Sequence, residues 1–152
     1  MNRISTFCLA ICSFVLLGLS SCEKEQERYD NITKMLEGNW KITRISTENE
    51  VFNNVGTIQF DACNATPANR TCSGTATDSI GKIYPLQVEL QAGKSYKDEL
   101  INISDRSDEG AIQPLSLLVS GQGFIIGEVK NNKLKWTPSD GRDFPAVELE
   151  KQ

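Results

Sequence analysis

Apolar residues alternate with polar ones along most of the chain beyond residue 38, a pattern typical of strands with one buried face. The clearest alternation covers 86–91, where Leu86, Val88 and Leu90 alternate with Gln87, Glu89 and Gln91. Over 40–45, alternation puts Trp40, Ile42 and Arg44 on one face and Lys41, Thr43 and Ile45 on the other. Further extended segments are predicted at 57–61, 101–103, 115–120, 124–129, 134–136 and 147–149.

Short polar connections separate the last predicted strands. They lie at 121–123, at 131–132 and around 140–141, and they are rich in Gly, Asn and Asp, as hairpin turns are. Successive hairpins form a meander, and eight or nine such strands remove their exposed edges by closing on themselves. The predicted fold is therefore an all-β, up-and-down antiparallel barrel, and a two-sheet sandwich is the competing architecture.

One short helix is predicted before the first strand. Asp30 or Asn31 caps it, Ile32 and Leu36 repeat at helical spacing together with Met35, and Gly38 stands where a helix of this length ends.

The N-terminus has the organisation of a signal peptide. Arg3 precedes a mainly apolar stretch at 7–19, which is too short to span a bilayer as a helix. The tetrapeptide Leu19-Ser20-Ser21-Cys22 resembles a bacterial lipobox, in which the cysteine thiol receives a diacylglyceryl group and the peptidase cuts before it. An ordinary secretory signal is the alternative. The predicted division is a signal peptide over 1–21, a flexible tether over 22–30 and a barrel domain over 31–152.

The resemblance implies a location as well as a modification. A lipid on Cys22 attaches the protein to a membrane, and the charged stretch at 23–28 has no apolar residue to bury. No aspartate follows Cys22, so the inner-membrane retention signal of enteric bacteria is missing. The charged residues after Cys22 resemble lipoprotein export signals of Gram-negative gut bacteria. We therefore expect an outer-membrane protein on the periplasmic or cell-surface face.

Two cysteines remain after the lipobox, Cys63 and Cys72, and they flank a polar connection. In an oxidising compartment an even pair predicts a disulfide. The rival interpretation is a metal site, but two thiolates without histidine fall short of the four ligands that zinc usually takes. No metal site and no cofactor are predicted. A calcium site at Asp105, Asp108 and Glu109 is the weaker alternative, because the EF-hand pattern is absent.

The composition argues against two classes of function. The chain has 16 Lys and Arg against 20 Asp and Glu, a net charge of −4, and no basic face for nucleic acid. Histidine is absent, which removes the commonest general base. The glycines at 121, 123 and 127 lead into a strand rather than a helix, so they do not predict a dinucleotide site. We therefore predict that the protein is not an enzyme.

The segment Leu36-Glu37-Gly38-Asn39-Trp40 resembles the lipocalin signature, a Gly-x-Trp after a helical turn at the start of the first strand. The domain also resembles lipocalin-like lipoproteins of Gram-negative gut bacteria, in the stretches 36–45, 56–60, 72–75, 134–137 and 147–150. No second lipocalin motif and no helix after the last strand are present. The resemblance implies a barrel with Trp40 plugging its closed end.

Two functions follow from this architecture. The first is binding of a small apolar or amphipathic ligand inside the barrel, for which the candidate residues are Trp40, Phe60, Leu86, Val88, Phe124, Ile126 and Trp136. The alternative is a non-enzymatic interaction or structural lipoprotein whose outer face docks a protein or glycan partner. A cavity of ~300 Å³ or more favours the ligand, and a filled interior favours docking. Ser79, in Asp78-Ser79-Ile80, resembles an O-glycosylation acceptor of the same bacteria.

Overall fold

The computed structural model describes residues 23–93, 99–107, 110–127, 129–143 and 145–152. Residues 23–36 are helical and lead into the strands. The remaining elements are β1 Gly38–Ser46, β2 Val51–Phe60, β3 Thr71–Asp78, β4 Ile83–Gln91, β5 Leu100–Asp105, α2 Ser116–Val119, β6 Ser120–Ile126, β7 Lys133–Pro138 and β8 Ala146–Lys151.

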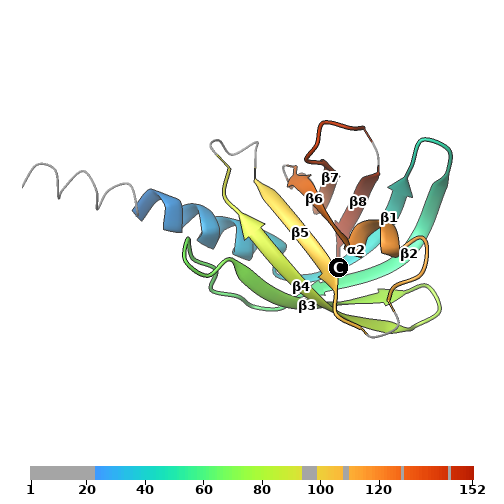
Figure 1. Ribbon diagram of the computed structural model, residues 1–152, viewed down its shortest axis with the longest axis horizontal. Helices are drawn as coiled ribbons and strands as arrows, with labels where there is room; N and C mark the ends of the chain where they lie inside the picture. Colours follow the sequence, from blue (N-terminus) through green and yellow to red (C-terminus); the bar gives the residue numbers. More distant parts are fainter. Residues whose placement is uncertain (1–22, 94–98, 108–109, 128, 144) are drawn as a thin grey trace, which may run out of the picture.

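The eight strands form one closed barrel in which each strand pairs antiparallel with the next one in sequence. β1 also pairs with β8, and this pairing closes the barrel (Figure 1). Trp40 shows both contacts, since it lies opposite Ile58 of β2 and opposite Lys151 of β8. The predicted up-and-down barrel is confirmed, and the two-sheet sandwich is excluded.

β4 follows its predicted alternation. Leu86, Val88 and Leu90 are buried, while Glu89 and Gln91 are exposed and Gln87 is half-buried. A shift of one residue would turn the polar set inward, so the apolar period fixes the register of this strand.

β1 departs from simple alternation because it contains a bulge. Its register against β8 shifts between Ile42 and Arg44, which leaves Thr43 without an opposing residue. The shift reverses the faces beyond it, so Ile45 is buried and Arg44 is exposed. The prediction that Arg44 shares a face with Trp40 and Ile42 is wrong, since an inserted residue breaks a period of two.

The segment 115–120 is not the predicted strand. Residues 116–119 form the short helix α2, and Ser120 begins β6. Leu115 and Leu118 are both buried, and the main-chain N–H of Val119 donates to the carbonyl of Leu115 at 3.2 Å. The glycines at 121 and 123 lie within β6 rather than in a hairpin turn. A short apolar run is compatible with either structure, and the spacing of its buried leucines fits a helix here.

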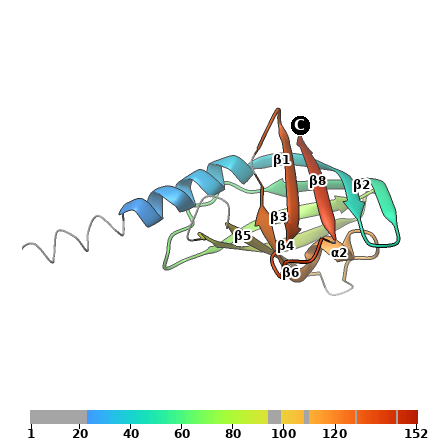
Figure 2. The same ribbon diagram turned by 90° about the horizontal axis from the view of Figure 1, so that it is seen from above.

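The N-terminal helix is longer than the predicted one. Helical structure already covers 23–30, which the sequence pattern assigned to a flexible tether. The reason is Tyr29, which continues the apolar stripe of Ile32 and Leu36 by one further turn, and all three side chains are buried. Figure 2 shows the helix projecting from one end of the barrel.

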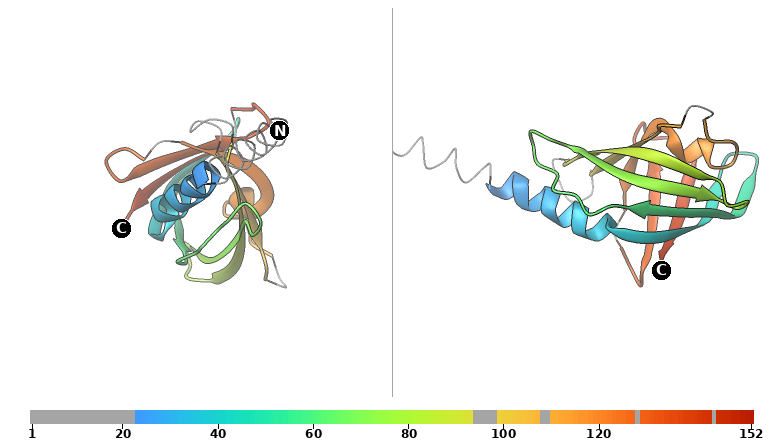
Figure 3. Two further views of the ribbon diagram at one scale, coloured as in Figure 1. Left: turned by 90° about the vertical axis from the view of Figure 1, so that its left-hand side faces the viewer. Right: turned by 90° about the horizontal axis from the view of Figure 1, so that it is seen from below.

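A helix lies at each end of the barrel. The N-terminal helix covers the end at which β1 begins, and Figure 3 shows it in front of the barrel from that side. α2 directly precedes β6, which begins at the opposite end because neighbouring strands alternate in direction, and Figures 1 and 2 show α2 away from the N-terminal helix. We call these the helix end and the far end.

Candidate functional site

The seven side chains predicted to line the interior are all buried, with exposed fractions between 0% and 4%. They come from β1, β2, β4, β6 and β7: Trp40, Phe60, Leu86, Val88, Phe124, Ile126 and Trp136.

These aromatic side chains contact one another and leave little space. The ring of Trp136 lies edge-on to Phe60, with 6.0 Å between ring centroids, and tilted against Phe124 at 6.2 Å. Trp40 lies near the helix end, where its indole N–H donates to the carbonyl of Leu36 at 2.7 Å. The predicted placement of Trp40, inside the barrel and against the helix, is confirmed.

A pocket beneath the N-terminal helix reaches the interior, but its volume is only about 10 Å³. Thr33 and Leu36 of the helix line it, together with Phe60, Val88 and Leu90 of the barrel and the residues Asp61, Cys63 and Cys72. That volume holds about one water molecule. In this structure the interior at the helix end is therefore filled by protein side chains.

Several buried polar atoms have no hydrogen-bond partner within the described residues, and one of them belongs to an interior candidate. The indole N–H of Trp136 is buried and makes no hydrogen bond there. A buried donor without an acceptor destabilises the fold by about 1–3 kcal/mol, so this N–H marks a position where an acceptor would bind favourably.

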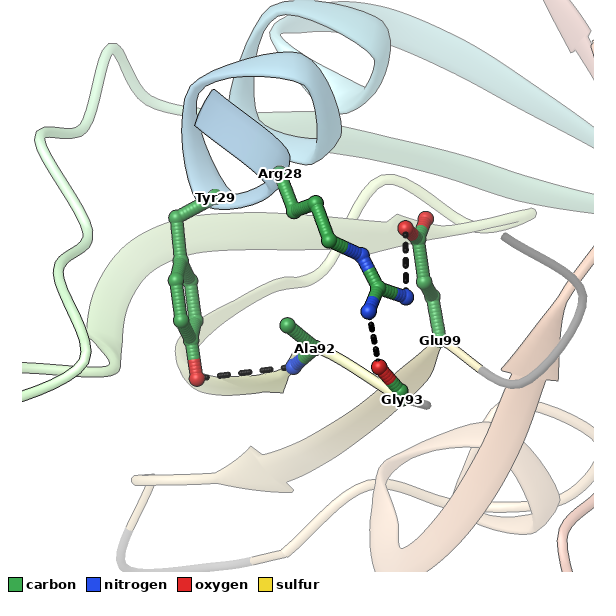
Figure 4. Close-up of polar contacts among 5 residues, drawn as sticks. All are labelled: Arg28, Tyr29, Ala92, Gly93 and Glu99. Atoms are coloured by element: carbon green, nitrogen blue, oxygen red, sulfur yellow. Dashed lines mark hydrogen bonds and ion pairs between the residues drawn. The ribbon is translucent and has the colours of Figure 1, made fainter. Parts of the chain in front are cut away.

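Polar contacts hold the first described turns of the N-terminal helix to the barrel (Figure 4). The Arg28 guanidinium donates to the carbonyl of Gly93, and its Nη2 lies 3.5 Å from Oε1 of Glu99. The hydroxyl of Tyr29 accepts a hydrogen bond from the main-chain N–H of Ala92 at 3.4 Å. Burial raises the pKa of the Glu99 carboxyl, and the charge of Arg28 opposes that rise. Sequence reasoning missed this pair, because nothing in the pattern relates residues so far apart.

A disulfide joins Cys63 to Cys72, as predicted, with their Cα atoms 5.7 Å apart. It closes the connection between β2 and β3 at the helix end. The N-terminal helix contacts this connection, since the side-chain amide of Gln26 donates to the carbonyl of Ala65 at 3.0 Å. The bridge therefore fixes one of the loops on which the helix rests.

The far end carries exposed apolar side chains. Ile80 is 79% exposed, Ile83 64% and Ile112 57%, and we call these three the isoleucine rim. Tyr84 links the two segments that carry Ile80 and Ile112, because its hydroxyl donates to Oδ2 of Asp78 at 3.0 Å and accepts a hydrogen bond from the main chain of Ile112. Gly81 indicates the turn between β3 and β4, but nothing in the sequence predicts that the three isoleucines lie at the same end of the barrel.

The carboxylate of Asp78 organises this turn. It accepts hydrogen bonds from the main-chain N–H groups of Ile80 at 3.0 Å and Lys82 at 2.9 Å. Burial acts to raise the pKa of Asp78, but the hydrogen bonds outweigh it and hold that pKa below its usual value. Ser79 is exposed in the same turn, and its glycosylation stays a prediction.

Some predicted positions lie outside the described residues. These are the lipobox with Cys22, and Asp108 and Glu109 of the calcium alternative. Within the described ranges, no group of three or more metal-binding side chains is found. No helix among them is long and apolar enough to cross a membrane.

Comparison with known proteins gives one structural likeness. No protein-family description and no curated protein matches the chain. The fold is similar to the crystal structure of a lipocalin-like protein from Bacteroides uniformis, with 10% sequence identity and a TM-score of 0.47, over 78% of this chain and 99% of that one. The closed eight-strand barrel with its N-terminal helix is established by the strand pairing itself.

Proposed function

We propose that the protein is a lipid-anchored, non-enzymatic interaction domain that docks a partner protein on the outside of its barrel. The observation that carries this proposal is the contrast between interior and surface. The interior candidates are buried, Trp136 packs against Phe60 and Phe124, and little space is left beneath the N-terminal helix, while the isoleucine rim remains exposed.

The anchor proposed at Cys22 gives the rim an orientation. Residue 22 directly precedes the helical residues 23–36, which lead to the helix end of the barrel. The helix is about 21 Å long at 1.5 Å per residue, and the rim lies at the opposite end of the barrel. A lipid on Cys22 would therefore present the rim away from the anchoring membrane, at the periplasmic or cell-surface face of the outer membrane.

The chemistry of the rim fits a protein partner. Ile80 on a hydrogen-bonded turn and Ile83 at the start of β4 provide a small apolar contact whose main chain is already ordered before binding. Asp78 precedes Ile80 in sequence, Lys82 lies between Ile80 and Ile83, and both supply polar groups at the edge. A compact apolar centre with a polar rim is the usual composition of a protein–protein contact.

Site-specific photo-crosslinking in the native membrane tests this proposal. A photoreactive residue in place of Ile83 should give one discrete protein adduct, and the same residue in place of the exposed Lys34 on the N-terminal helix should not. Ile80→Lys combined with Ile112→Lys should abolish the adduct, whereas Val51→Lys on the neighbouring hairpin should leave it. A lack of adduct, or one that persists in the double variant, would refute docking at the rim.

A second function is favoured by one observation, the unpartnered indole N–H of Trp136. A small amphipathic ligand carrying a hydrogen-bond acceptor would satisfy that donor, provided that side chains around Phe60 move to admit it. The two functions differ in their response to substitution. Loss of binding in Phe60→Ala at full stability would support the ligand, whereas loss in the isoleucine variants supports docking.

A further inference from the structure

A groove of about 670 Å³ crosses the outer face of the barrel where β1, β8 and β7 lie side by side. It shares no residue with the isoleucine rim or with the seven interior candidates, and two buried core residues, Leu134 and Leu149, lie beneath it. Its polar lining comes from four strands and one turn: Thr43, Arg44, Asn53, Lys130, Asn131, Lys133, Lys135, Glu148 and Glu150.

The bulge in β1 directs Arg44 to this groove. In a regular strand Arg44 would share the inner face of Trp40 and Ile42, but the shift at Thr43 brings it to the outside. The hydroxyl of Thr43 donates to the main-chain carbonyl of Glu148 at 3.0 Å, which holds the bulge against β8. Bulges of this kind commonly redirect a side chain next to a functional site.

The lining carries more positive than negative charge, although the whole chain has a net charge of −4. Four cationic side chains surround two carboxylates. Glu148 lies opposite Arg44 on one side and Lys135 on the other, and Glu150 lies opposite Lys133.

These cations are only weakly neutralised by the protein. Arg44 makes an ion pair with Glu148 at 3.9 Å, and both side chains are nearly half exposed. Such a pair contributes little stability. The three lysines make no ion pair with any carboxylate in the described part of the chain, so they remain available to an anion.

We propose that this groove binds an acidic polysaccharide, a sugar chain in which carboxylated units alternate with uncharged, hydroxyl-rich units. Arg44 and the lysines pair with the carboxylates of the sugar chain. Glu148 and Glu150 accept hydrogen bonds from sugar hydroxyls, and the amides of Asn53 and Asn131 exchange hydrogen bonds with the uncharged units.

The two carboxylates of the groove decide against a densely charged partner. A nucleic acid duplex carries one negative charge per ~1.7 Å, so Glu148 and Glu150 would repel it at any register. A chain with spaced charges avoids both carboxylates while it contacts the lysines on either side. The groove has the volume of a small-molecule site, ~300–1,000 Å³. It lies on the solvent-exposed outer face of the barrel, where a segment of a longer sugar chain can bind and extend beyond it.

Titration calorimetry on the complete lipoprotein in neutral detergent tests the proposal. The probe is an oligosaccharide of alternating glucuronate and N-acetylglucosamine units, and the comparisons are dextran of equal length and inorganic polyphosphate. The oligosaccharide should bind, and more weakly as salt rises. Lys133→Gln with Lys135→Gln should raise its Kd by about tenfold or more, since two charge-assisted contacts are lost. Arginine at both positions should restore binding.

The matched control is Lys24→Gln with Lys34→Gln, which removes the same charge from exposed positions on the N-terminal helix. This variant should bind like the unaltered protein. The proposal would be overturned if both double variants lost affinity equally, or if dextran bound as tightly as the acidic oligosaccharide. It would also be overturned if polyphosphate bound more tightly through the same lysines, or if the normally folded protein did not bind the oligosaccharide. The melting temperature of each variant verifies folding.

Discussion

Arg28 of the N-terminal helix and Glu99, the residue before β5, form an ion pair at 3.5 Å although they are 71 residues apart in sequence. Within the described residues Glu99 is the only charged side chain that is buried. A buried carboxylate needs compensation, and the helix supplies it. The helix is therefore joined to the barrel by charge as well as by its apolar face.

The first prediction concerns Arg28→Gln. The variant leaves the buried Glu99 carboxylate without its cation, and we expect a loss of about 1–3 kcal/mol of folding stability at neutral pH. Urea unfolding followed by tryptophan fluorescence measures it. Arg28→Gln combined with Glu99→Gln should recover part of the loss, and Lys34→Gln on the exposed side of the same helix should have little effect.

The pH dependence of the same pair gives a second prediction. Burial raises the pKa of Glu99 in the folded protein above its unfolded value, so the folded state favours the protonated carboxyl. This contribution to stability is complete below the unfolded pKa and is lost as pH rises through the folded pKa. Arg28→Gln raises the folded pKa further, so its cost should be smaller at about pH 4 than at about pH 7. An equal cost at both would contradict the assignment.

The third prediction concerns the filled interior. Phe60→Ala or Phe124→Ala removes a ring that contacts Trp136, and each should destabilise the protein by about 3–5 kcal/mol. Neither should alter partner docking at temperatures where the variant is folded. Val51→Ala, at a position 50% exposed, is the control for a surface substitution and should be nearly neutral. A small cost for both phenylalanines would indicate an open interior.

The fourth prediction concerns the disulfide between Cys63 and Cys72. Replacing both cysteines by serine opens a loop of about ten residues, which should reduce stability by about 2.5–3 kcal/mol in the chain-entropy model. Unfolding of the variant beside the unaltered protein measures this loss. Thiol titration of the denatured, unreduced protein is the direct check, and reactive thiols at these two positions would contradict the bridge.

The strands that could be predicted are those with large apolar residues at every second position. β4 has this pattern, and its register and faces agree with the structure. β3 has small inward residues, Gly74 and Ala76, so its apolar signal is weak. Its closeness to β2 explains the choice of residue: a Cβ on Gly74 would lie 2.5 Å from the carbonyl oxygen of Gln59. Alternation alone could not identify such a strand.

The surface sites depend on features that a periodic pattern does not record. The bulge at Thr43 moves Arg44 to the outer groove, and alternation predicts the opposite face. The segments that carry Ile80 and Ile112 are linked through the hydroxyl of Tyr84, a contact that alternation does not record. In contrast, the seven interior candidates were all identified correctly as buried, because closing a meander turns every apolar face inward.

Native mass spectrometry of the protein, purified from its own cells in neutral detergent, tests most directly whether binding takes place on the outside of a filled barrel. We predict one species, with the mass of the chain from Cys22 onward, its acyl groups and any covalent glycan, and without a retained small molecule. A defined non-covalent small molecule that dissociates from the unaltered protein, and is missing from folded Phe60→Ala protein, would contradict it and place the function inside the barrel.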